Sequence, residues 1–222
     1  MSAPAVPLIA VVGMVREAQI IAGAGVTVVI GGGQSAALEQ RLEAALAGAV
    51  GEVRLLSFGV CGALSAELRP GDLVIGETVV SGGDRWSADP AWTKALRQAL
   101  PHAHMAKIAA GDAMIGSVAA KSELRGRTGP AAVDMESHVV ARLAQRRGLG
   151  FAVVRAVSDA ADHALPSAAL AGLGPDGQPD IGAVLRSLAR RPWQLPALLR
   201  TASGAEAGFR ALKAAAAAIS PP

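Results

Sequence analysis

The sequence predicts an α/β protein with a mainly parallel or mixed sheet. Short β-branched apolar runs alternate along the chain with segments whose apolar residues recur at helical spacing. At 222 residues and 51% hydrophobic, the chain is large enough for one extensive core. Glycine and alanine are abundant and only 3% of residues are aromatic, which favours close helix–sheet packing. We therefore expect residues 1–222 to form a single domain, with a helical segment at 181–219.

The expected strands read as buried, and each is followed by a turn or a helix signal. They cover residues 7–13, 26–30, 55–58, 73–80, 107–110, the short run from 131 to 134, and 151–157. Helices are expected at 14–21, from Ser35 through the Leu38, Leu42 and Leu46 stripe, at 91–100, from Met135 to the stop at Gly148, and at 181–188, 193–200 and 206–219. Residues 81–90 are expected to form a mobile loop at the mouth of a site, and residues 164–180 a second loop.

Carboxylates follow two of the expected strands. Glu136 follows the short apolar run at 131–134, and Asp159 follows the strand at 151–157. Ligands of open α/β sheets bind outside the carboxyl ends of strands, so we expect these side chains to share one crevice. From residue type alone, Asp159 is equally well explained as a cap of the following helix.

Composition and charge restrict the class of protein. The net charge is only +3 and no basic motif with interleaved aromatics is present, so we expect no nucleic-acid partner. The single cysteine, Cys61, excludes an intramolecular disulfide and fits a reducing compartment. The first strand lacks a preceding basic stretch, and no apolar run reaches the ~18–20 residues of a spanning helix. These features predict a cytoplasmic protein.

Three sequence blocks, in this order, resemble the nucleoside phosphorylase and nucleosidase superfamily. They are Gly59-Val60-Cys61-Gly62-Ala63-Leu64 followed by Leu68-Arg69-Pro70-Gly71-Asp72-Leu73-Val74, then Val133-Asp134-Met135-Glu136, and then Val154-Arg155-Ala156-Val157-Ser158-Asp159-Ala160-Ala161-Asp162. The resemblance extends from about Pro7 to His163. It implies a three-layer α/β/α fold with a mixed sheet, cleavage of a nucleoside N-glycosidic bond, and a homo-oligomer of at least two copies.

A finer resemblance is to the hopanoid-biosynthesis-associated branch of this superfamily. It depends on the short N-terminal half, on Val60-Cys61, and on Arg190-Arg191-Pro192-Trp193 followed by the 195–200 segment LPALLR. This branch implies release of adenine from adenosylhopane, a lipid with an adenosine-like head. The alternatives are a methylthioadenosine/adenosylhomocysteine-type nucleosidase and another purine nucleoside phosphorylase.

The resemblance assigns roles around the nucleoside. Asp159 would protonate N7 of the leaving adenine, a contribution worth about 10²–10⁴-fold, and apolar walls would keep its proton in place near neutral pH. Glu136 would hold the ribose hydroxyls, with Met135 against the sugar. Met114 and Ser158 would lie against the base. Without the resemblance, Glu136 could simply complement a helix N-terminus, and Met135 could be a core residue.

The motifs leave two nucleophiles open for attack on the sugar, water and phosphate. Glu17 aligns with the family's water-activating glutamate if one residue is deleted after Gly13, whereas a gap-free alignment places Ala18 there. A phosphorylase would instead bind inorganic phosphate as co-substrate through glycine amides and arginine. The candidates for this phosphate or water site are Gly13, Arg16, Gly33, Gly59 and Val60, the last of which replaces a serine of the family. Both phosphorolysis and hydrolysis stay open, and neither requires a cofactor.

Two residues near these motifs are expected to be structural. Cys61 is interpreted as a small buried residue, since no histidine clearly partners it. Arg155 lies inside an expected strand and is interpreted as the partner of a carboxylate.

The C-terminal segment combines arginines with apolar side chains. Arg186, Arg190, Arg191 and Arg200 flank Trp193 and three leucines. This composition suits peripheral contact with an anionic membrane face through residues 186–200. A packed C-terminal helix with a solvated basic side explains it as well.

Two other classes of protein remain. A metal-dependent hydrolase could use Asp159, Asp162 and His163, with Asp134, although no metal-binding spacing supports it and we expect no metal. A non-catalytic nucleoside-binding protein would account for Val60.

Overall fold

The computed structural model describes residues 6–23, 25–170, 178 and 180–219, and eight strands of this part form one sheet. The strands are β1 (Leu8–Val12), β2 (Val26–Ile30), β3 (Arg54–Ala63), β4 (Leu73–Ser81), β5 (Asp84–Ser87), β6 (His104–Ala110), β7 (Ala132–Asp134) and β8 (Phe151–Asp159). The helices are α1 (Val15–Ile21), α2 (Ser35–Ala47), α3 (Pro90–Ala99), α4 (Val118–Thr128), α5 (Ser137–Arg147), α6 (Ser167–Leu170), α7 (Ile181–Arg190), the 3₁₀ turn η1 (Pro192–Gln194) and α8 (Leu195–Ile219).

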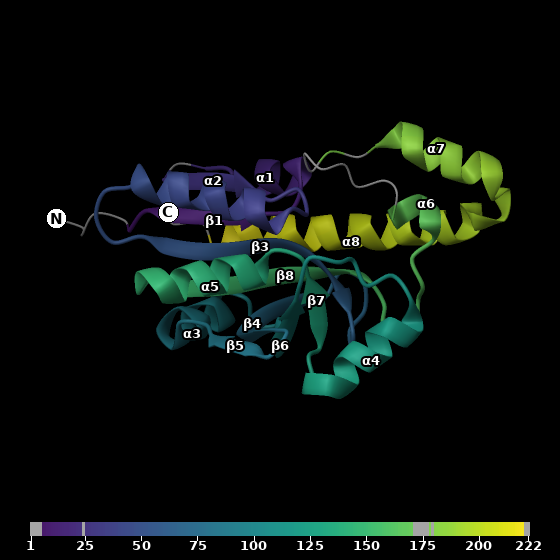
Figure 1. Cartoon of the computed structure of the whole chain (residues 1–222). Helices are drawn as coiled ribbons and strands as arrows, with labels where there is room; N and C mark the ends of the chain where they lie inside the picture. Colours follow the sequence, from purple (N-terminus) through teal and green to yellow (C-terminus); the bar gives the residue numbers. More distant parts are fainter. Residues whose placement is uncertain (1–5, 24, 171–177, 179, 220–222) are drawn as a thin grey trace.

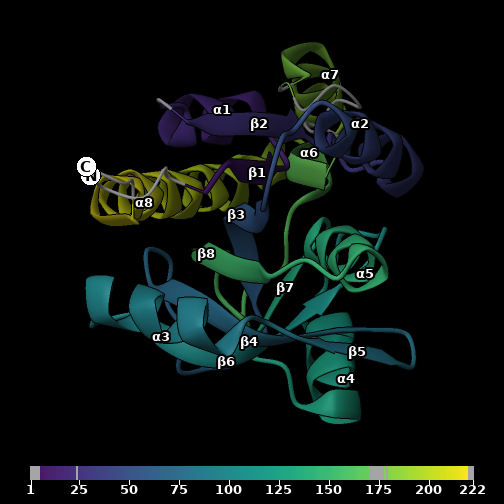
Figure 2. The same cartoon turned by 90° about the vertical axis from the view of Figure 1, so that its left-hand side faces the viewer.

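The sheet is mixed and part of it closes on itself. Strand β3 pairs parallel with β1 and β8 and antiparallel with β7, while β2 extends the sheet beyond β1. Strand β4 pairs parallel with β6 and antiparallel with β8 and β5, and β6 pairs parallel with β7. The pairings β3–β7–β6–β4–β8 therefore form a ring, which Figure 2 shows nearly end-on. Strand β8 lies at the centre of the fold, so its whole apolar run is buried.

Helices cover both faces of the sheet (Figure 1). On one face α2 and α5 contribute Leu38, Leu42, Val139 and Leu143 to a common core. On the other face α1, α3 and α8 pack their apolar side chains against β1, β4 and β8. The expected three-layer α/β/α architecture with a mixed sheet is confirmed.

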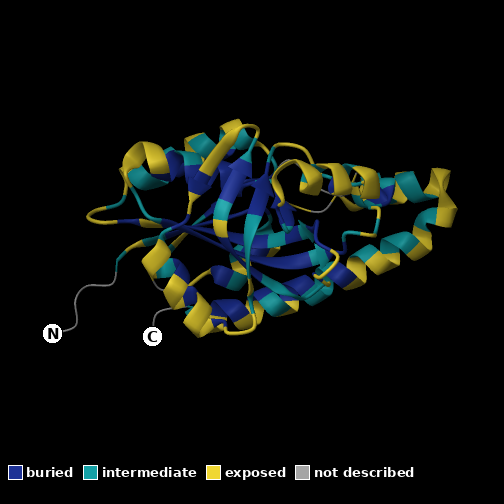
Figure 3. Cartoon of the chain, turned by 90° about the horizontal axis from the view of Figure 1, so that it is seen from below, coloured by how far each residue is buried: buried dark blue, intermediate teal, exposed yellow. Residues whose placement is uncertain are grey.

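Helix α8 is one continuous helix, where the sequence suggested separate segments at 193–200 and 206–219. From Gly204 onward α8 packs on the sheet, and a Cβ atom at Gly204 would collide with the carbonyl oxygen of Ser158 in β8. Its first turns and α7 extend past the end of the sheet (Figure 1), and exposed positions recur along this end of the molecule (Figure 3). No described helix is both long enough and apolar enough to span a membrane.

The structure corrects the expected mobile loop at 81–90. Residues 84–87 form β5, which pairs antiparallel with β4, and the buried indole of Trp86 donates from Nε1 to Gln145 Oε1 at 2.9 Å. The polar, glycine-rich composition of residues 81–90 is typical of a loop. A hairpin with a two-residue turn and a short edge strand has the same composition, so composition does not distinguish the two. None of these residues lines the cavity described below.

Two helices were not predicted. The sequence of α4 has almost no apolar stripe, and the one residue that the helix buries is Lys121. The periodicity of apolar residues therefore could not predict this helix. Helix α6 lies within the expected loop at 164–180. Residues 171–177 and 179 of that loop lie outside the described residues.

Candidate active site

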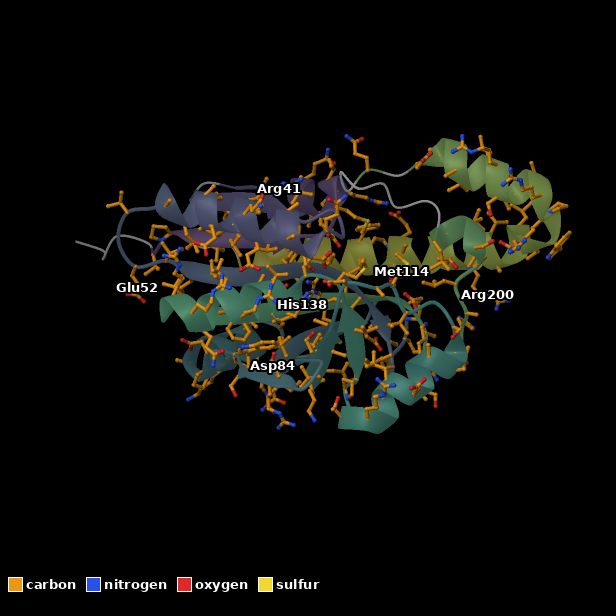
Figure 4. All side chains as sticks on the ribbon, in the orientation of Figure 1. Arg41, Glu52, Asp84, Met114, His138 and Arg200 are labelled. Carbon is orange, nitrogen blue, oxygen red and sulfur yellow. The ribbon has the colours of Figure 1, made fainter. Side chains whose placement is uncertain are left out.

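A cavity of about 420 Å³ lies at the carboxyl ends of β1, β3, β7 and β8, beneath α6, α7 and α8. Most of the predicted site residues line it. They are Gly13, Glu17, Val60, Met114, Met135, Glu136, Ser158 and Asp159. In Figure 4 Met114 is labelled near α8, whereas Asp84 is labelled far from it, on the edge strand β5, and does not line the cavity. The expected crevice at the strand ends is therefore present, and its remaining wall comes from the C-terminal helices.

Asp159 is buried at the end of β8, and both of its oxygens are engaged. Oδ1 accepts a hydrogen bond from Ser158 Oγ at 2.7 Å, and Oδ2 lies 2.5 Å from the Nζ atom of Lys121. Gly62 makes room for this carboxylate, since a Cβ there would lie 3.2 Å from Oδ2. Apolar residues line the cavity with Asp159 as expected, but the carboxyl group also has a buried ammonium as its direct partner, which the expectation did not include.

Glu136 lies at the start of α5, on the floor of the cavity. The pKa of its carboxyl is raised to about 7, chiefly by burial; the Arg155 guanidinium opposes this rise, and the nearby carboxylates of Asp134 and Glu17 add to it. A Cβ at Gly13 would lie 2.7 Å from Glu136 Oε1, and one at Gly31 would lie 3.1 Å from its Cγ. The two glycine turns thus leave the space that Glu136 fills.

Arg155 is fully buried in the middle of β8 and holds the acidic side chains together. Its Nη1 lies 3.3 Å from Glu136 Oε2, and its Nη2 donates to Ser57 Oγ at 2.7 Å. Its Nε lies 2.9 Å from Asp134 Oδ2 without the alignment of a hydrogen bond, so this contact is an ion pair only. The expectation that Arg155 pairs with a carboxylate is confirmed.

Glu17 faces the cavity from the first turn of α1, and Ala18 is not among the lining residues. Its Oε2 accepts from the amides of Gly13 at 2.7 Å and Met14 at 2.9 Å, and its Oε1 accepts from the amide of Val60 at 2.7 Å. Burial raises the pKa of Glu17, while Arg155 and these three amides oppose the rise. Glu17 therefore occupies the backbone amides that could otherwise bind an anion.

Three predicted phosphate-site residues do not line the cavity. Arg16 pairs with Glu206 of α8 at 2.7 Å and lies over the ring of Phe209, so it ties α1 to α8. Gly59 lies behind the cavity, where a Cβ would come within 2.6 Å of Glu17 Oε1. Gly33 has a positive φ of 70° and forms the turn between β2 and α2. Their positions give no support to a role in phosphate binding.

Cys61 lines the cavity but is almost completely buried, and burial raises the pKa of its thiol. It accordingly has the environment of a small core residue, as expected.

Sequence reasoning missed Lys121 and the contribution of α8. Thr201, Ala205 and Phe209 of α8 line the cavity, although they lie outside the three recognised motifs. A lysine among polar helical residues carries no local signal of burial.

No three His, Cys, Asp or Glu side chains lie close enough to hold a metal ion within the part of the chain that the structure describes. His163 and Asp162 approach each other only to 3.9 Å. The metal-dependent alternative therefore gains no support.

Comparisons with known proteins agree with this geometry. A family model described as the phosphorylase superfamily matches residues 10–172, which is well over half of the chain. The chain belongs to the phosphorylase superfamily. This membership confirms the expectation that it is an enzyme that cleaves N-glycosidic bonds. No curated protein sequence matches the chain.

Solved structures share the superfamily fold with this chain. Futalosine hydrolase of Helicobacter pylori superimposes with a TM-score of 0.59 at 20% identity, covering 83% of this chain and 98% of that protein. The 5'-methylthioadenosine/S-adenosylhomocysteine nucleosidase of Helicobacter pylori gives 0.60 at 17% identity, covering 95% and 97%. S-adenosylhomocysteine nucleosidase from Streptococcus pyogenes gives 0.61 at 18% identity, covering 94% and 98%. At these identities the likeness establishes the fold.

Proposed function

We propose that this phosphorylase-superfamily enzyme releases adenine from an adenosine-type nucleoside by hydrolysis. The observation that carries the proposal is the placement of Glu17, Glu136 and Asp159 around one cavity. Asp159, at the base end beside Ser158 and Met114, serves as general acid for N7 of the base. Glu136 accepts hydrogen bonds from the ribose hydroxyls, and these strengthen as positive charge develops on the sugar.

Hydrolysis is favoured over phosphorolysis by the hydrogen bonds of Glu17. The amides of Gly13 and Val60, which would be suited to phosphate, already donate to this carboxylate. Arg16 is turned to Glu206, and Arg155 is fully buried beneath the site. A carboxylate at this position can take a proton from an attacking water, whereas it repels a phosphate dianion. No cofactor is needed for this reaction.

We further propose that the substrate carries an apolar group, with adenosylhopane as the leading candidate. Val184 of α7 and Leu198 of α8 line the cavity, and the same helices expose Leu185 and Leu199 on their outer faces. An apolar substituent on the nucleoside could thus extend from the cavity along these helices. Methylthioadenosine and adenosylhomocysteine are the alternative substrates.

The decisive experiment incubates the protein with adenosylhopane, methylthioadenosine and adenosine, with and without phosphate. Adenine release is measured and the sugar product is identified by mass spectrometry. We expect adenine and the free sugar at equal rates with and without phosphate. A sugar phosphate formed only in the presence of phosphate would replace hydrolysis by phosphorolysis. Tight nucleoside binding without adenine release would instead indicate a non-catalytic binding protein.

We also propose that the α7–α8 end touches an anionic membrane face peripherally. Trp193 is 73% exposed and Leu185 and Leu199 are 60% and 62% exposed, and Arg186 and Arg190 lie in the same segment of the chain. Apolar side chains ringed by arginines suit the headgroup region of anionic lipid. A cytoplasmic location and a homo-oligomer of at least two copies belong to the same proposal.

Flotation with anionic and neutral vesicles tests this contact. The double variant Trp193→Ser with Leu199→Ser should lose binding to anionic vesicles, whereas Val50→Ser, which alters a highly exposed apolar residue outside α7 and α8, should retain it. Equal flotation of all three proteins, or none by the unmodified protein, would reject membrane contact.

A further inference from the structure

Helix α4 has one buried side chain, and that side chain is a lysine. Lys121 is 1% exposed, and its Nζ lies 2.5 Å from Asp159 Oδ2, 2.7 Å from the carbonyl oxygen of Ala160 and 3.0 Å from that of His163. Three acceptors match the three N–H donors of an ammonium, whereas a neutral amine has only two hydrogens to donate. A buried charge is costly unless it is paired, so the pairing with Asp159 is what makes this burial tolerable.

The contacts of Asp159 include a proton donor that lies directly against one of its oxygens. Its Oδ1 accepts from Ser158 Oγ, while its Oδ2 accepts from Lys121. An oxygen that accepts from an ammonium carries no proton of its own, so Oδ2 receives its hydrogen from Lys121. The ammonium of Lys121 is in direct contact with this oxygen and does carry a proton.

We propose that Lys121 is a positioning residue for glycosidic cleavage, which fixes Asp159 and holds the proton that Asp159 passes to the base. This inference rests on the proposed function. As the C1'–N9 bond breaks, its electron pair moves into the base, and the oxygen of the attacking water bonds to C1' while Glu17 takes the proton of that water. Lys121 gives one proton to Asp159 as Asp159 passes one to N7, so the ammonium becomes an amine and the charge of Asp159 is unchanged. After the neutral base leaves, Glu17 releases its proton to solvent and the amine takes one from solvent.

The titratable groups around the pair come from the neighbouring elements. Cys61 of β3 lies near Asp159, Asp162 and His163 lie in the turn after β8, and Arg200 and Arg210 of α8 line the same outer cavity as Asp159. His163 is partly exposed and offers Lys121 only its carbonyl oxygen. A His163→Gln variant therefore tests whether the imidazole contributes to the pH profile, since it leaves the carbonyl oxygen that Lys121 uses in place.

The test measures kcat and KM for adenine release between pH 5 and pH 9. In Lys121→Met, kcat should fall by about 10²-fold at pH 8, at the lower end of general-acid contributions. At pH 5 the loss should shrink to within about tenfold, because acidic solvent then supplies the proton that Lys121 otherwise provides. KM should change much less than kcat. Lys121→Gln keeps a donor to Asp159 but holds no transferable proton, so it should show the same profile, and it serves if the methionine variant does not fold.

Lys107→Met is the matched control, because Lys107 donates to the carbonyl oxygen of Thr128 at the other end of α4. Its pH profile should equal that of the unmodified protein. Three results for the Lys121 variants would overturn the proposal: a loss of kcat that is the same at every pH, an unchanged kcat, or a kcat that persists to higher pH than in the unmodified protein. Each of these results leaves the proposed function intact, provided that the unmodified protein releases adenine. If the unmodified protein releases no adenine, the proposed function fails and this inference fails with it.

Discussion

Replacing Glu136 with glutamine removes one ionisable group from the cluster at the cavity floor and keeps the shape of the side chain. Burial raises the pKa of this carboxyl from 4.5 to about 7, against the opposing charge of Arg155. The folded protein therefore binds a proton here more tightly than the unfolded chain does. The contribution to stability is fully present below about pH 4.5 and is lost as the pH rises through about 7.

The size of this effect follows from the two pKa values. A shift from 4.5 to about 7, at 1.36 kcal/mol per pKa unit, corresponds to about 3 kcal/mol. Glutamine does not titrate, so the free energy of unfolding of the variant does not fall in this way as the pH rises. At pH 5 the unmodified side chain is largely protonated and close to glutamine in hydrogen-bonding capacity, and the two proteins should differ by no more than about 1 kcal/mol.

Urea unfolding at pH 5 and pH 8.5 checks the prediction. Between these pH values, the free energy of unfolding of Glu136→Gln should rise by about 3 kcal/mol relative to that of the unmodified protein. Glu52→Gln, at an exposed position (Figure 4), should stay within about 0.5 kcal/mol of the unmodified protein at both pH values. An equal stability difference at pH 5 and pH 8.5 for Glu136→Gln would refute the buried-charge explanation.

Two further substitutions test the acid and the backbone around it. Asp159→Asn should slow adenine release by about 10²–10⁴-fold, and near-normal turnover would contradict its role as acid. It should also lower the free energy of unfolding by about 3–5 kcal/mol, because the buried ammonium of Lys121 loses its partner; adding Lys121→Met should restore stability to urea but not activity. Gly59→Ala places a Cβ 2.6 Å from Glu17 Oε1 and should cost about 1–3 kcal/mol in thermal unfolding, whereas Gly83→Ala meets nothing within 4 Å. Equal melting temperatures for the two alanine variants would contradict the close packing at Gly59.

Local patterns in the sequence were sufficient for most of the architecture. The β-branched run at 151–157 became the central strand β8, since such a run is stable only when buried on both faces. Gly148 ends α5 with a positive φ of 63°, a conformation that glycine adopts without strain. Helix α4 escaped prediction because it has a buried lysine where an apolar stripe would be expected.

The acidic residues of the site were also predictable, because they directly follow strands whose carboxyl ends meet at one edge. Glu136 and Asp159 reach the same cavity for this reason, and Glu17 joins them from the turn after β1. Residue type alone left helix capping as an equal explanation for Asp159, and it was the resemblance of the surrounding motifs to a known superfamily that indicated glycosidic chemistry.

What each side chain binds was decided only by the tertiary structure. Lys121 and Asp159 are 38 positions apart, and Arg16 and Glu206 are 190 apart, so no spacing pattern links either pair. The same holds for Glu17, which takes the Val60 amide from a strand 43 residues away. Strand runs, helix ends and acidic strand termini depend on near neighbours in the chain, and the sequence alone determined them. The partner of a buried charge depends on which elements pack together, and only the folded chain determines that.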